Sequence, residues 1–156
     1  MIQAIEAIRR HVVVAASQQR AFEVFTDGMT GWWPAHHHIG TAPIEEIVVE
    51  HREGGRWYTR HADGSETQTG HVMAWEPHER VVLSWQIGAD WRYDPQLVTT
   101  VELRFVAEAP DRTRVELEHR DLERFGPDAE RMRQVFSGPD AWEGTLAAFA
   151  GALPPA

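Results

Sequence analysis

The sequence predicts an α+β fold, in which a curved antiparallel β-sheet of six to seven strands wraps around a long C-terminal helix. One or two short helices are expected after the first strand. Three observations support this: β-rich runs alternate with turns between residues 44 and 120, an amphipathic segment follows the first β-rich run, and the strongest helical stripe lies near the C-terminus. A single long helix covers only one face of such a sheet, so the sheet should curve around it and leave room for a cavity.

The N-terminal segment is predicted to form a strand and then a helix. β-branched residues are frequent between residues 4 and 15, which favours a strand. Ser17 is a good N-cap for the next segment, where apolar residues recur at helical spacing, at Ala21, Phe22, Phe25 and Met29. Gly28 is expected to end this helix. Pro34 limits a second, short helical turn to residues 29–33, because proline disfavours the α conformation in the residue before it.

The middle of the chain predicts six strands joined mostly by tight turns. The alternation of apolar and polar residues places them at 44–51, 56–61, 66–75, 80–87, 97–108 and 112–120. Turn residues separate most of these runs, among them Gly54-Gly55, Asp63-Gly64, Pro77 and Pro110. The connection at residues 88–95 is longer, and its Trp91 and Tyr93 are unusually large for a loop.

The last two strands can be aligned from their side chains. Val101, Leu103 and Phe105 must share a face with Val115, Leu117 and His119, so the residue numbers of each cross-strand pair add to an even number. A sum of 222 sets Glu102 opposite Arg120, whereas a sum of 220 sets Glu102 opposite Glu118. Because opposite charges stabilise a cross-strand pair and like charges destabilise it, we predict the sum of 222.

The C-terminal part is predicted to be helical with one interruption. A first helix should run from Pro127 to Phe136, with proline in its first turn, and Ser137-Gly138-Pro139 should break or bend it. Asp140 with Glu143 resembles a capping box that restarts the helix. The restarted helix carries a single apolar stripe at Trp142, Leu146, Phe149 and Leu153.

Composition narrows the class of protein. A chain of 156 residues predicts one domain, residues 1–156, with one hydrophobic core. The 15 basic residues are all arginine and face 24 acidic ones, and the net charge of -9 argues against nucleic acid and anionic membranes as partners. The absence of cysteine excludes disulfides and a thiol nucleophile. No apolar run approaches the roughly 20 residues of a membrane span, so we expect a cytoplasmic monomer or homodimer.

Nine histidines invite a search for a metal site, and we predict none. Consecutive side chains do not converge on one ion, so His36, His37 and His38 are interpreted as a solvated polar loop. His51, His61 and His71 are evenly spaced, but in an antiparallel meander His51 and His61 lie at opposite ends of a hairpin, roughly 20 Å apart. No cofactor is expected.

Several residues are candidates for a ligand-binding cavity on the concave face. His119 shares the inward face with Val115 and Leu117, so it is either a core histidine or a polar anchor for a ligand. The two tryptophans Trp32 and Trp33 lie in a short glycine-bounded segment, as core or as rim. The full set of expected ligand-binding residues is Trp32, Trp33, His71, Trp75, Trp85, Leu103, His119 and Trp142.

The order of the local motifs resembles a known family. The residues that carry it are Pro77, Arg80, Val82 and Trp85 of the segment EPHERVVLSW, the Trp-Trp-Pro at 32–34, the hairpin DGSETQTGHV, the last two strands, and SGPDAWEGTL, in which Ala141 replaces a usual glycine. These resemble the family related to the activator of the heat-shock-protein ninety ATPase, within the START and Bet v-like superfamily. The resemblance implies the helix-grip fold with a hydrophobic cavity, found in co-chaperone domains, polyketide cyclases, lipid carriers and bacterial single-domain members.

Three functions follow as hypotheses. The first is binding of a small apolar or aromatic molecule between the sheet and the helix at 140–153, without catalysis, since no nucleophile with an adjacent base, no carboxylate pair and no phosphate-binding loop is evident. The second, implied by the resemblance, is regulation of the heat-shock-protein ninety ATPase through a surface contact with that chaperone. The third is a cyclase or hydratase that uses His71 or His119 as acid or base.

Overall fold

The computed structural model describes residues 5–154. Its elements follow the predicted order: β1 (Ile8–Val14), α1 (Gln18–Thr26), a short 3-10 turn η1 (Met29–Gly31), β2 (Ile44–Val49), β3 (Arg56–His61), β4 (Glu66–Glu76), β5 (Arg80–Trp85), β6 (Thr99–Ala109), β7 (Arg112–Arg120), a 3-10 segment η2 (Leu122–Asp128), α2 (Ala129–Ser137), a π-helical turn η3 (Pro139–Glu143) and α3 (Gly144–Gly151). The first strand was expected from residue 4, which lies outside the described residues.

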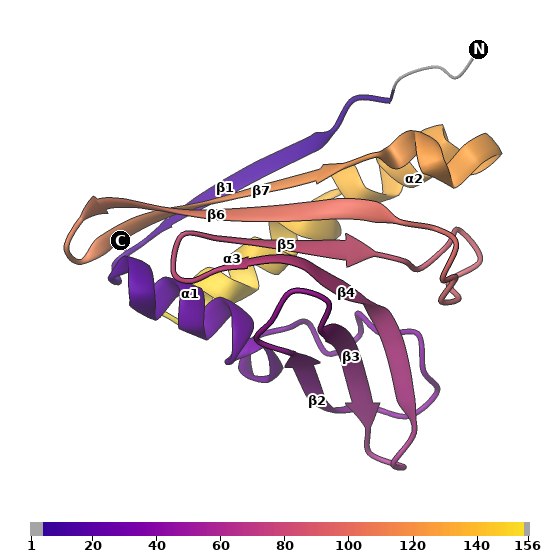
Figure 1. Cartoon of the computed structure of the whole chain (residues 1–156), viewed down its shortest axis with the longest axis horizontal. Coiled ribbons are helices and arrows are strands. Elements are labelled where there is room, and N and C mark those ends of the chain that lie inside the picture. Colours follow the sequence, from indigo (N-terminus) through magenta and orange to yellow (C-terminus); the bar gives the residue numbers. More distant parts are fainter. Residues whose placement is uncertain (1–4, 155–156) are drawn as a thin grey trace.

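The strands form one curled antiparallel sheet in the order β1-β7-β6-β5-β4-β3-β2, so every neighbour pair except β1-β7 is also consecutive in sequence. The helical C-terminal segment crosses behind the sheet in Figure 1, and α1 lies at one end of it. This arrangement confirms the predicted α+β helix-grip fold. The strands β2 and β3 turn away from the direction of β5, β6 and β7, which gives the sheet its curl (Figure 1).

The N-terminal helix begins where its capping residue predicts. The Ser17 side chain accepts a hydrogen bond from the Arg20 backbone amide at 3.1 Å, which satisfies one of the free amides of the first turn. The helix ends at Thr26 with Asp27 as its C-cap, and the predicted short turn follows at Met29. Phe22 and Phe25 on its inward face are buried.

The predicted register of the last two strands is wrong. Phe105 pairs with Val115 and Glu102 with Glu118, which corresponds to a sum of 220 rather than 222. The like-charged pair is tolerated because Arg120 bridges it, with Nη1 2.7 Å from Glu102 Oε1 and 3.1 Å from Glu118 Oε1. Cations that are not directly opposite Glu102 therefore neutralise this pair.

The C-terminal helices keep the predicted break and the predicted stripe. Gly138 is extended at φ -67° and ψ 159°, and it separates α2 from the π-helical turn. The stripe is buried over its whole length, at Trp142, Leu146, Phe149 and Leu153. The expected capping box at Asp140 and Glu143 is absent, because neither residue forms a side-chain cap and the chain restarts through the π-helical turn instead.

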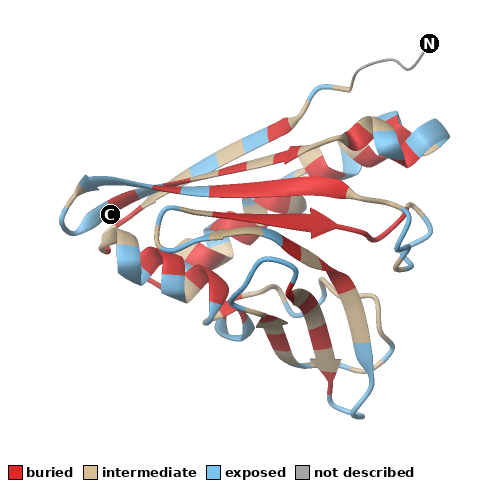
Figure 2. Ribbon diagram, in the orientation of Figure 1, coloured by how far each residue is buried: buried red, intermediate tan, exposed pale blue. Residues whose placement is uncertain are grey.

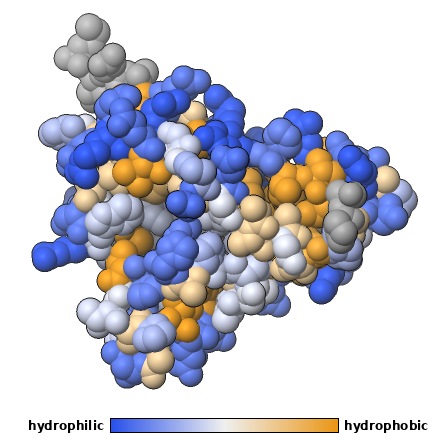
Figure 3. Space-filling view, turned by 180° about the vertical axis from the view of Figure 1, so that it is seen from behind, coloured by the Kyte–Doolittle hydropathy of each residue, from blue (hydrophilic) through white to orange (hydrophobic). Residues whose placement is uncertain are grey.

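Buried residues gather between the sheet and the helices. Figure 2 shows burial alternating along β3, and the strand carries buried Trp57, Thr59 and His61 on one face. On the face seen from behind in Figure 3, hydrophilic residues dominate and hydrophobic ones show in smaller patches. In residues 5–154 the exposed large hydrophobic side chains are Met73, Trp91, Val106 and Val135. The curl thus encloses one main apolar layer and leaves a mostly polar exterior.

Candidate functional site

A cavity of about 550 Å³ lies between the concave side of the sheet and the C-terminal helical segment. Strands β2 to β5 form its floor, and the segment from Trp33 to Ile39 closes one side. The end of α2, the π-helical turn and α3 close another, and Trp91 reaches it from the loop after β5. Its lining residues are Trp33, His36, His37, His38, Ile39, Ile47, Trp57, Thr59, Thr67, Thr69, Trp85, Ile87, Trp91, Val135, Phe136, Gly138, Pro139, Asp140, Ala141, Trp142 and Thr145.

Indole rings make up much of this lining. Five of the seven tryptophans of the chain contribute to it. Their rings meet largely edge to face: Trp33 lies 6.0 Å from Trp57 at 89°, and Trp85 lies 5.6 Å from Trp142 at 78°. Edge-to-face contacts hold aromatic rings in fixed orientations, so these side chains form a rigid wall with ring faces available to a ligand.

Trp91 lies over the cavity in an unusual backbone conformation. Its φ is 60°, in the left-handed region that bulky residues rarely adopt, and its side chain is 48% exposed. This conformation costs on the order of 1 to 2 kcal/mol for a non-glycine residue. A large apolar ring held in this way beside a cavity is more consistent with a role in binding than with packing.

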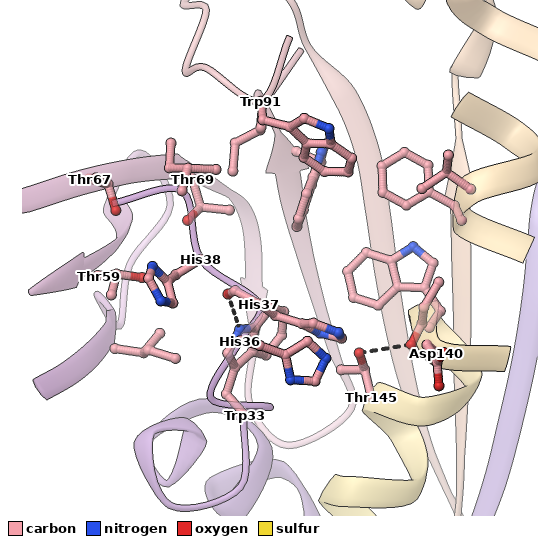
Figure 4. Close-up of a pocket in the computed structure, with 18 of the residues that line it drawn as sticks. Trp33, His36, His37, His38, Thr59, Thr67, Thr69, Trp91, Asp140 and Thr145 are labelled. Atoms are coloured by element: carbon pink, nitrogen blue, oxygen red, sulfur yellow. Dashed lines mark hydrogen bonds between the residues drawn. The ribbon is translucent and has the colours of Figure 1, made fainter. Parts of the chain in front are cut away.

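Polar groups stand at separate points of the cavity. Thr59 and Thr67 face each other across β3 and β4, and Thr69 continues the same face of β4. On the opposite side, Thr145 Oγ1 donates a hydrogen bond to the Ala141 carbonyl at 3.0 Å. Figure 4 shows the hydroxyls of the first group and of Thr145 on opposite sides of the space. A threonine hydroxyl both donates and accepts, so these residues suit a ligand with oxygen functions.

The three consecutive histidines line the cavity; His36 is exposed, as the predicted solvated loop requires, whereas His37 and His38 are half-buried against the cavity. The indole N-H of Trp33 donates to the His37 carbonyl at 2.8 Å, and this bond folds the loop over the cavity. In Figure 4 the imidazoles of His36 and His37 extend toward Asp140 and Thr145, whereas His38 lies against the β-strand threonines. The three side chains point in different directions, as expected of consecutive residues, but tertiary packing places all of them along the wall of the same cavity.

Burial lowers the pKa of His37, and the neighbouring His36 lowers it further. A hydrogen bond to the backbone of Asp140 and the charge of its carboxylate act in the opposite direction. The Nδ1 atom of His38 is buried and has no hydrogen-bond partner among the described residues. The loop therefore brings ionisable and polar nitrogen atoms to a largely aromatic cavity.

His119 is fully buried behind the cavity wall rather than inside it. The Trp142 indole N-H donates to His119 Nδ1 at 3.0 Å, and His119 Nε2 lies 2.8 Å from Thr99 Oγ1. The Thr99 hydroxyl donates to the Trp85 carbonyl at 2.9 Å, so it accepts from the imidazole and fixes the neutral tautomer with the proton on Nε2. Burial lowers the pKa of His119 to about 3, in keeping with this neutral state. The expected ligand anchor is thus a residue that positions the cavity tryptophans Trp85 and Trp142.

The structure brings together only part of the predicted binding set. Trp33, Trp85 and Trp142 line the cavity, and the other five candidates do not. Trp32 is a core residue whose indole N-H donates to the Val24 carbonyl at 2.8 Å, and Leu103 is fully buried in the core.

His71 and Trp75 are displaced from the cavity for a different reason. His71 lies on the opposite face of the sheet and contacts Gln86 through Nδ1 at 2.9 Å, because β4 changes register against β3 between residues 68 and 70. Trp75 packs instead against Phe22 and stacks on His51 at 4.9 Å. The two histidines proposed as acid or base, His71 and His119, therefore do not face the cavity.

Other lining residues escaped the sequence analysis. Trp57 and Thr59 share the buried face of β3 with His61 and alternate with Tyr58 and Arg60, and this period-2 pattern was a usable signal for an inward face. Asp140 and Trp91 had no such signal, because Trp91 lies in a loop and Asp140 in a short π-helical turn. His61 is fully buried and bonds through Nδ1 to the Ala42 carbonyl at 2.9 Å, so it anchors the loop rather than a ligand.

Two further features bear on the kind of site this is. In the part of the chain from residue 5 to 154, no group of three or more histidine, cysteine, aspartate or glutamate side chains is placed to hold a metal ion. None of the helices in that same range is both long and apolar enough to span a bilayer.

Comparisons with known proteins agree with this geometry. The family model described as "Activator of Hsp90 ATPase homolog 1-like protein" matches residues 15–152. No curated protein sequence matches the chain at a significant level. Among solved structures, the anthrahydroquino-γ-pyrone synthase Txn09, complexed with SUM, is 35% identical with a TM-score of 0.68, covering 96% of this chain and 98% of that one.

Two other solved structures extend the comparison. The self-sacrificing resistance protein CalC from Micromonospora echinospora is 28% identical with a TM-score of 0.70, covering 94% of this chain and 92% of that one. Protein NE0264 from Nitrosomonas europaea, at 14% identity and a TM-score of 0.65 with 93% and 92% of the two chains covered, shares the fold. The chain belongs to the family of Activator of Hsp90 ATPase homolog 1-like proteins and has its START-like, helix-grip fold.

Proposed function

We propose that this protein binds a flat aromatic small molecule with oxygen functions, held between the sheet and the C-terminal helices. The observation that carries the proposal is the lining of one cavity of about 550 Å³ by five tryptophans and four threonines. Ligand pockets commonly measure about 300 to 1,000 Å³ and combine apolar walls with a few polar groups. Indole walls favour flat rings over flexible chains, because stacking rewards a matching plane.

Burial of such a ligand is sufficient for useful affinity. If a fused three-ring molecule buries roughly 250 Å² of apolar surface at about 25 cal/mol per Å², the gross gain is about 6 kcal/mol. Immobilising the ligand offsets part of this gain. The interlocked indoles reduce the cost on the protein side, since their orientations are already fixed. A gain of about 6 kcal/mol corresponds to a Kd of roughly 40 μM, so apolar burial alone gives an affinity of tens of micromolar or weaker, and hydrogen bonds to the threonines must add to it.

The relatives support the same class of ligand. Txn09 is by its name a synthase of an anthrahydroquino-γ-pyrone, a fused aromatic ring system with oxygen functions. CalC is a resistance protein, which indicates that this fold also serves proteins other than synthases. Binding of a fused aromatic molecule is the property that a synthase of this kind needs.

Regulation of a chaperone ATPase receives less support from the surface. A surface contact of that kind calls for a contiguous exposed apolar patch. Of the large hydrophobic side chains exposed in residues 5–154, Trp91 and Val135 belong to the cavity. Met73 and Val106 lie on separate strands, β4 and β6.

The test is a titration with anthraquinone sulfonate, followed by isothermal calorimetry and by quenching of tryptophan emission. The parent protein should bind this flat probe more tightly than dodecanoate, a flexible apolar chain. Trp91→Ala should weaken binding about ten-fold, because one ring contact of about 1.4 kcal/mol is lost. Met73→Ala is the matched control, since Met73 is comparably exposed, at 41% against 48%, but lies outside the cavity. Equal affinity for both probes, or equal effects of both substitutions, would contradict the proposal.

A further inference from the structure

The Thr67 hydroxyl stands out among the polar groups of the cavity because a buried histidine controls the direction of its hydrogen bond. Thr67 lies on β4, lines the cavity and pairs with Thr59 on β3. His61 lies further along the same face of β3, diagonally across from Thr67. The His61 Nε2 atom is 2.8 Å from Thr67 Oγ1. A core histidine behind the wall therefore contacts one of the hydroxyls of the cavity directly.

The other ring nitrogen of His61 identifies the donor in this contact. Nδ1 lies 2.9 Å from the Ala42 carbonyl, which can only accept, so Nδ1 carries a hydrogen. His61 is fully buried, and both of its ring contacts are to neutral groups. A charged imidazole would be costly in such a place, so the ring is neutral and Nε2 has a lone pair. Thr67 therefore donates its only hydroxyl hydrogen to His61 and keeps its oxygen lone pairs for the cavity.

The loop before β2 holds this imidazole in place. Gly40 is the second of the two glycines that bound the segment GWWPAHHHIG. A Cβ added at Gly40 would lie 2.5 Å from His61 Nε2 and 2.6 Å from its Cε1, so the loop backbone packs directly against the ring. The Ala42 carbonyl comes from the same loop. The fold itself thus fixes the imidazole, and with it the direction of the Thr67 hydrogen bond.

A second polar atom at this end of the cavity is left for a ligand. The His38 ring lies 5.4 Å from the His61 ring, centroid to centroid, and against the β-strand threonines (Figure 4). His38 lines the cavity, and its buried Nδ1 atom has no hydrogen-bond partner within residues 5–154. Buried polar atoms in folded proteins nearly always have a partner. A ligand hydroxyl, which both donates and accepts, would suit an acceptor at Thr67 and an unused nitrogen at His38.

We propose that Thr67 accepts a hydrogen bond from a hydroxyl group of the ligand, so that the cavity selects aromatic molecules with a free hydroxyl over the same ring system with that hydroxyl methylated. This rests on the binding function proposed above. A methyl ether or a carbonyl has an oxygen but no hydrogen to donate, so it would face the Thr67 lone pairs without a bond. His61 is a positioning residue, because it acts on the ligand only through the Thr67 hydroxyl.

Three anthraquinones that differ in one substituent separate hydrogen donation from shape. β-Hydroxyanthraquinone and β-aminoanthraquinone can donate, whereas β-methoxyanthraquinone can only accept. At the β position none of these substituents reaches a quinone carbonyl. Binding is followed by quenching of tryptophan emission in mildly acidic buffer, in which the phenol stays neutral. The parent protein should bind the hydroxy compound about ten-fold more tightly than the methoxy compound, and the amino compound should behave like the hydroxy compound.

Three variants assign this preference to Thr67. Thr67→Val nearly keeps the shape but removes the acceptor, so the preference should fall to about two-fold or less. Thr67→Ser keeps the hydroxyl and should retain the preference. Thr69→Val is the matched control and should also retain it, because Thr69 lines the same wall but its hydroxyl hydrogen is not held by His61. Circular dichroism checks that each variant is folded, and the comparison of the three compounds on the parent protein tests the donor requirement without any variant.

The outcomes separate the two proposals. If anthraquinone sulfonate binds but the parent protein takes the hydroxy and methoxy compounds equally, acceptance by Thr67 is refuted and the binding function stands. The same conclusion follows if the amino compound binds as weakly as the methoxy compound. A preference that survives in Thr67→Val, or that is lost equally in Thr69→Val, overturns the assignment to Thr67. If none of these anthraquinones binds to the parent protein, both proposals fail together.

Discussion

The two hydrogen bonds of the buried His119 side chain lead to a quantitative prediction about stability. The imidazole accepts from the Trp142 indole and donates to the Thr99 hydroxyl, so two substitutions should separate its functions. In His119→Gln the amide oxygen can accept from Trp142 and the amide nitrogen can donate to Thr99, so both hydrogen bonds can be kept. In His119→Leu the volume is nearly kept, but the Trp142 N-H loses its acceptor.

The cost of each change can be worked from the structure. An unsatisfied buried donor costs about 1 to 3 kcal/mol, so His119→Leu should lower the free energy of unfolding by about that amount at pH 7. His119→Gln should cost less than about 1 kcal/mol, because no buried polar group is left without a partner. Comparing His119→Gln with His119→Leu therefore isolates the effect of keeping a hydrogen-bond donor and acceptor at residue 119.

The pH dependence is the sharper part of the prediction. Burial lowers the pKa of His119 from 6.5 to about 3. Between these two pH values the unfolded chain therefore binds a proton at His119 that the folded chain does not bind. Because the folded pKa lies below the unfolded one, this contribution is fully present above about pH 6.5 and is lost as the pH falls toward 3. Between pH 7 and pH 5 the loss amounts to about 2 kcal/mol. His119→Gln lacks this contribution.

The assay is urea denaturation of the parent and of His119→Gln at both pH values, followed by far-ultraviolet circular dichroism so that changed tryptophan emission does not interfere. The parent should lose about 2 kcal/mol more than the variant on going from pH 7 to pH 5, since all other histidines contribute equally to both. The reasoning is refuted if the two proteins lose the same amount. It is also refuted if His119→Leu is as stable as His119→Gln at pH 7.

Two further substitutions test the packing of the sheet. Gly70→Ala should destabilise the protein by about 1 to 3 kcal/mol, because a Cβ at this position would lie 1.8 Å from the Ser84 carbonyl oxygen. Gly31→Ala is the control: a Cβ there has nothing within 4 Å, so the melting temperature should change little. Glu102→Ala should cost about 1 to 3 kcal/mol. Burial raises the pKa of Glu102, but hydrogen bonds from Arg120 and a second arginine outweigh it and hold the pKa below its usual value. The loss in Glu102→Ala should therefore shrink as the pH falls below about 4.5 in urea denaturation, and a pH-independent loss would contradict this account.

The sequence by itself determined the order of the elements and the face that each presents. Local signals suffice for this, because a helix repeats over 3 to 4 residues and a strand over 2. Ser17 marks the start of α1 within one turn, and the stripe from Trp142 to Leu153 already identifies the buried side of the last helix. The family resemblance and the curled sheet follow from the same ordered pattern.

Only the tertiary structure decided the register of the last strands and the composition of the cavity. The pairing of Glu102 with Glu118 looks unfavourable when two strands are considered alone, and it is stable because Arg80 on a third strand and Arg120 on a diagonal also contact Glu102. A rule that considers only directly opposite residues on two strands leaves out the arginines on a third strand and on the diagonal.

The cavity shows the same limit. His37 and Asp140 are separated by about a hundred residues, and neither the loop around His37 nor the short π-helical turn that holds Asp140 has a repeat long enough to indicate which way its side chains face. They meet because the loop that the Trp33 indole fastens is folded against the turn after α2. Periodicity assigns a side chain to a face of its own element, whereas a binding site is defined by distances between elements, and those are set only when the whole core packs.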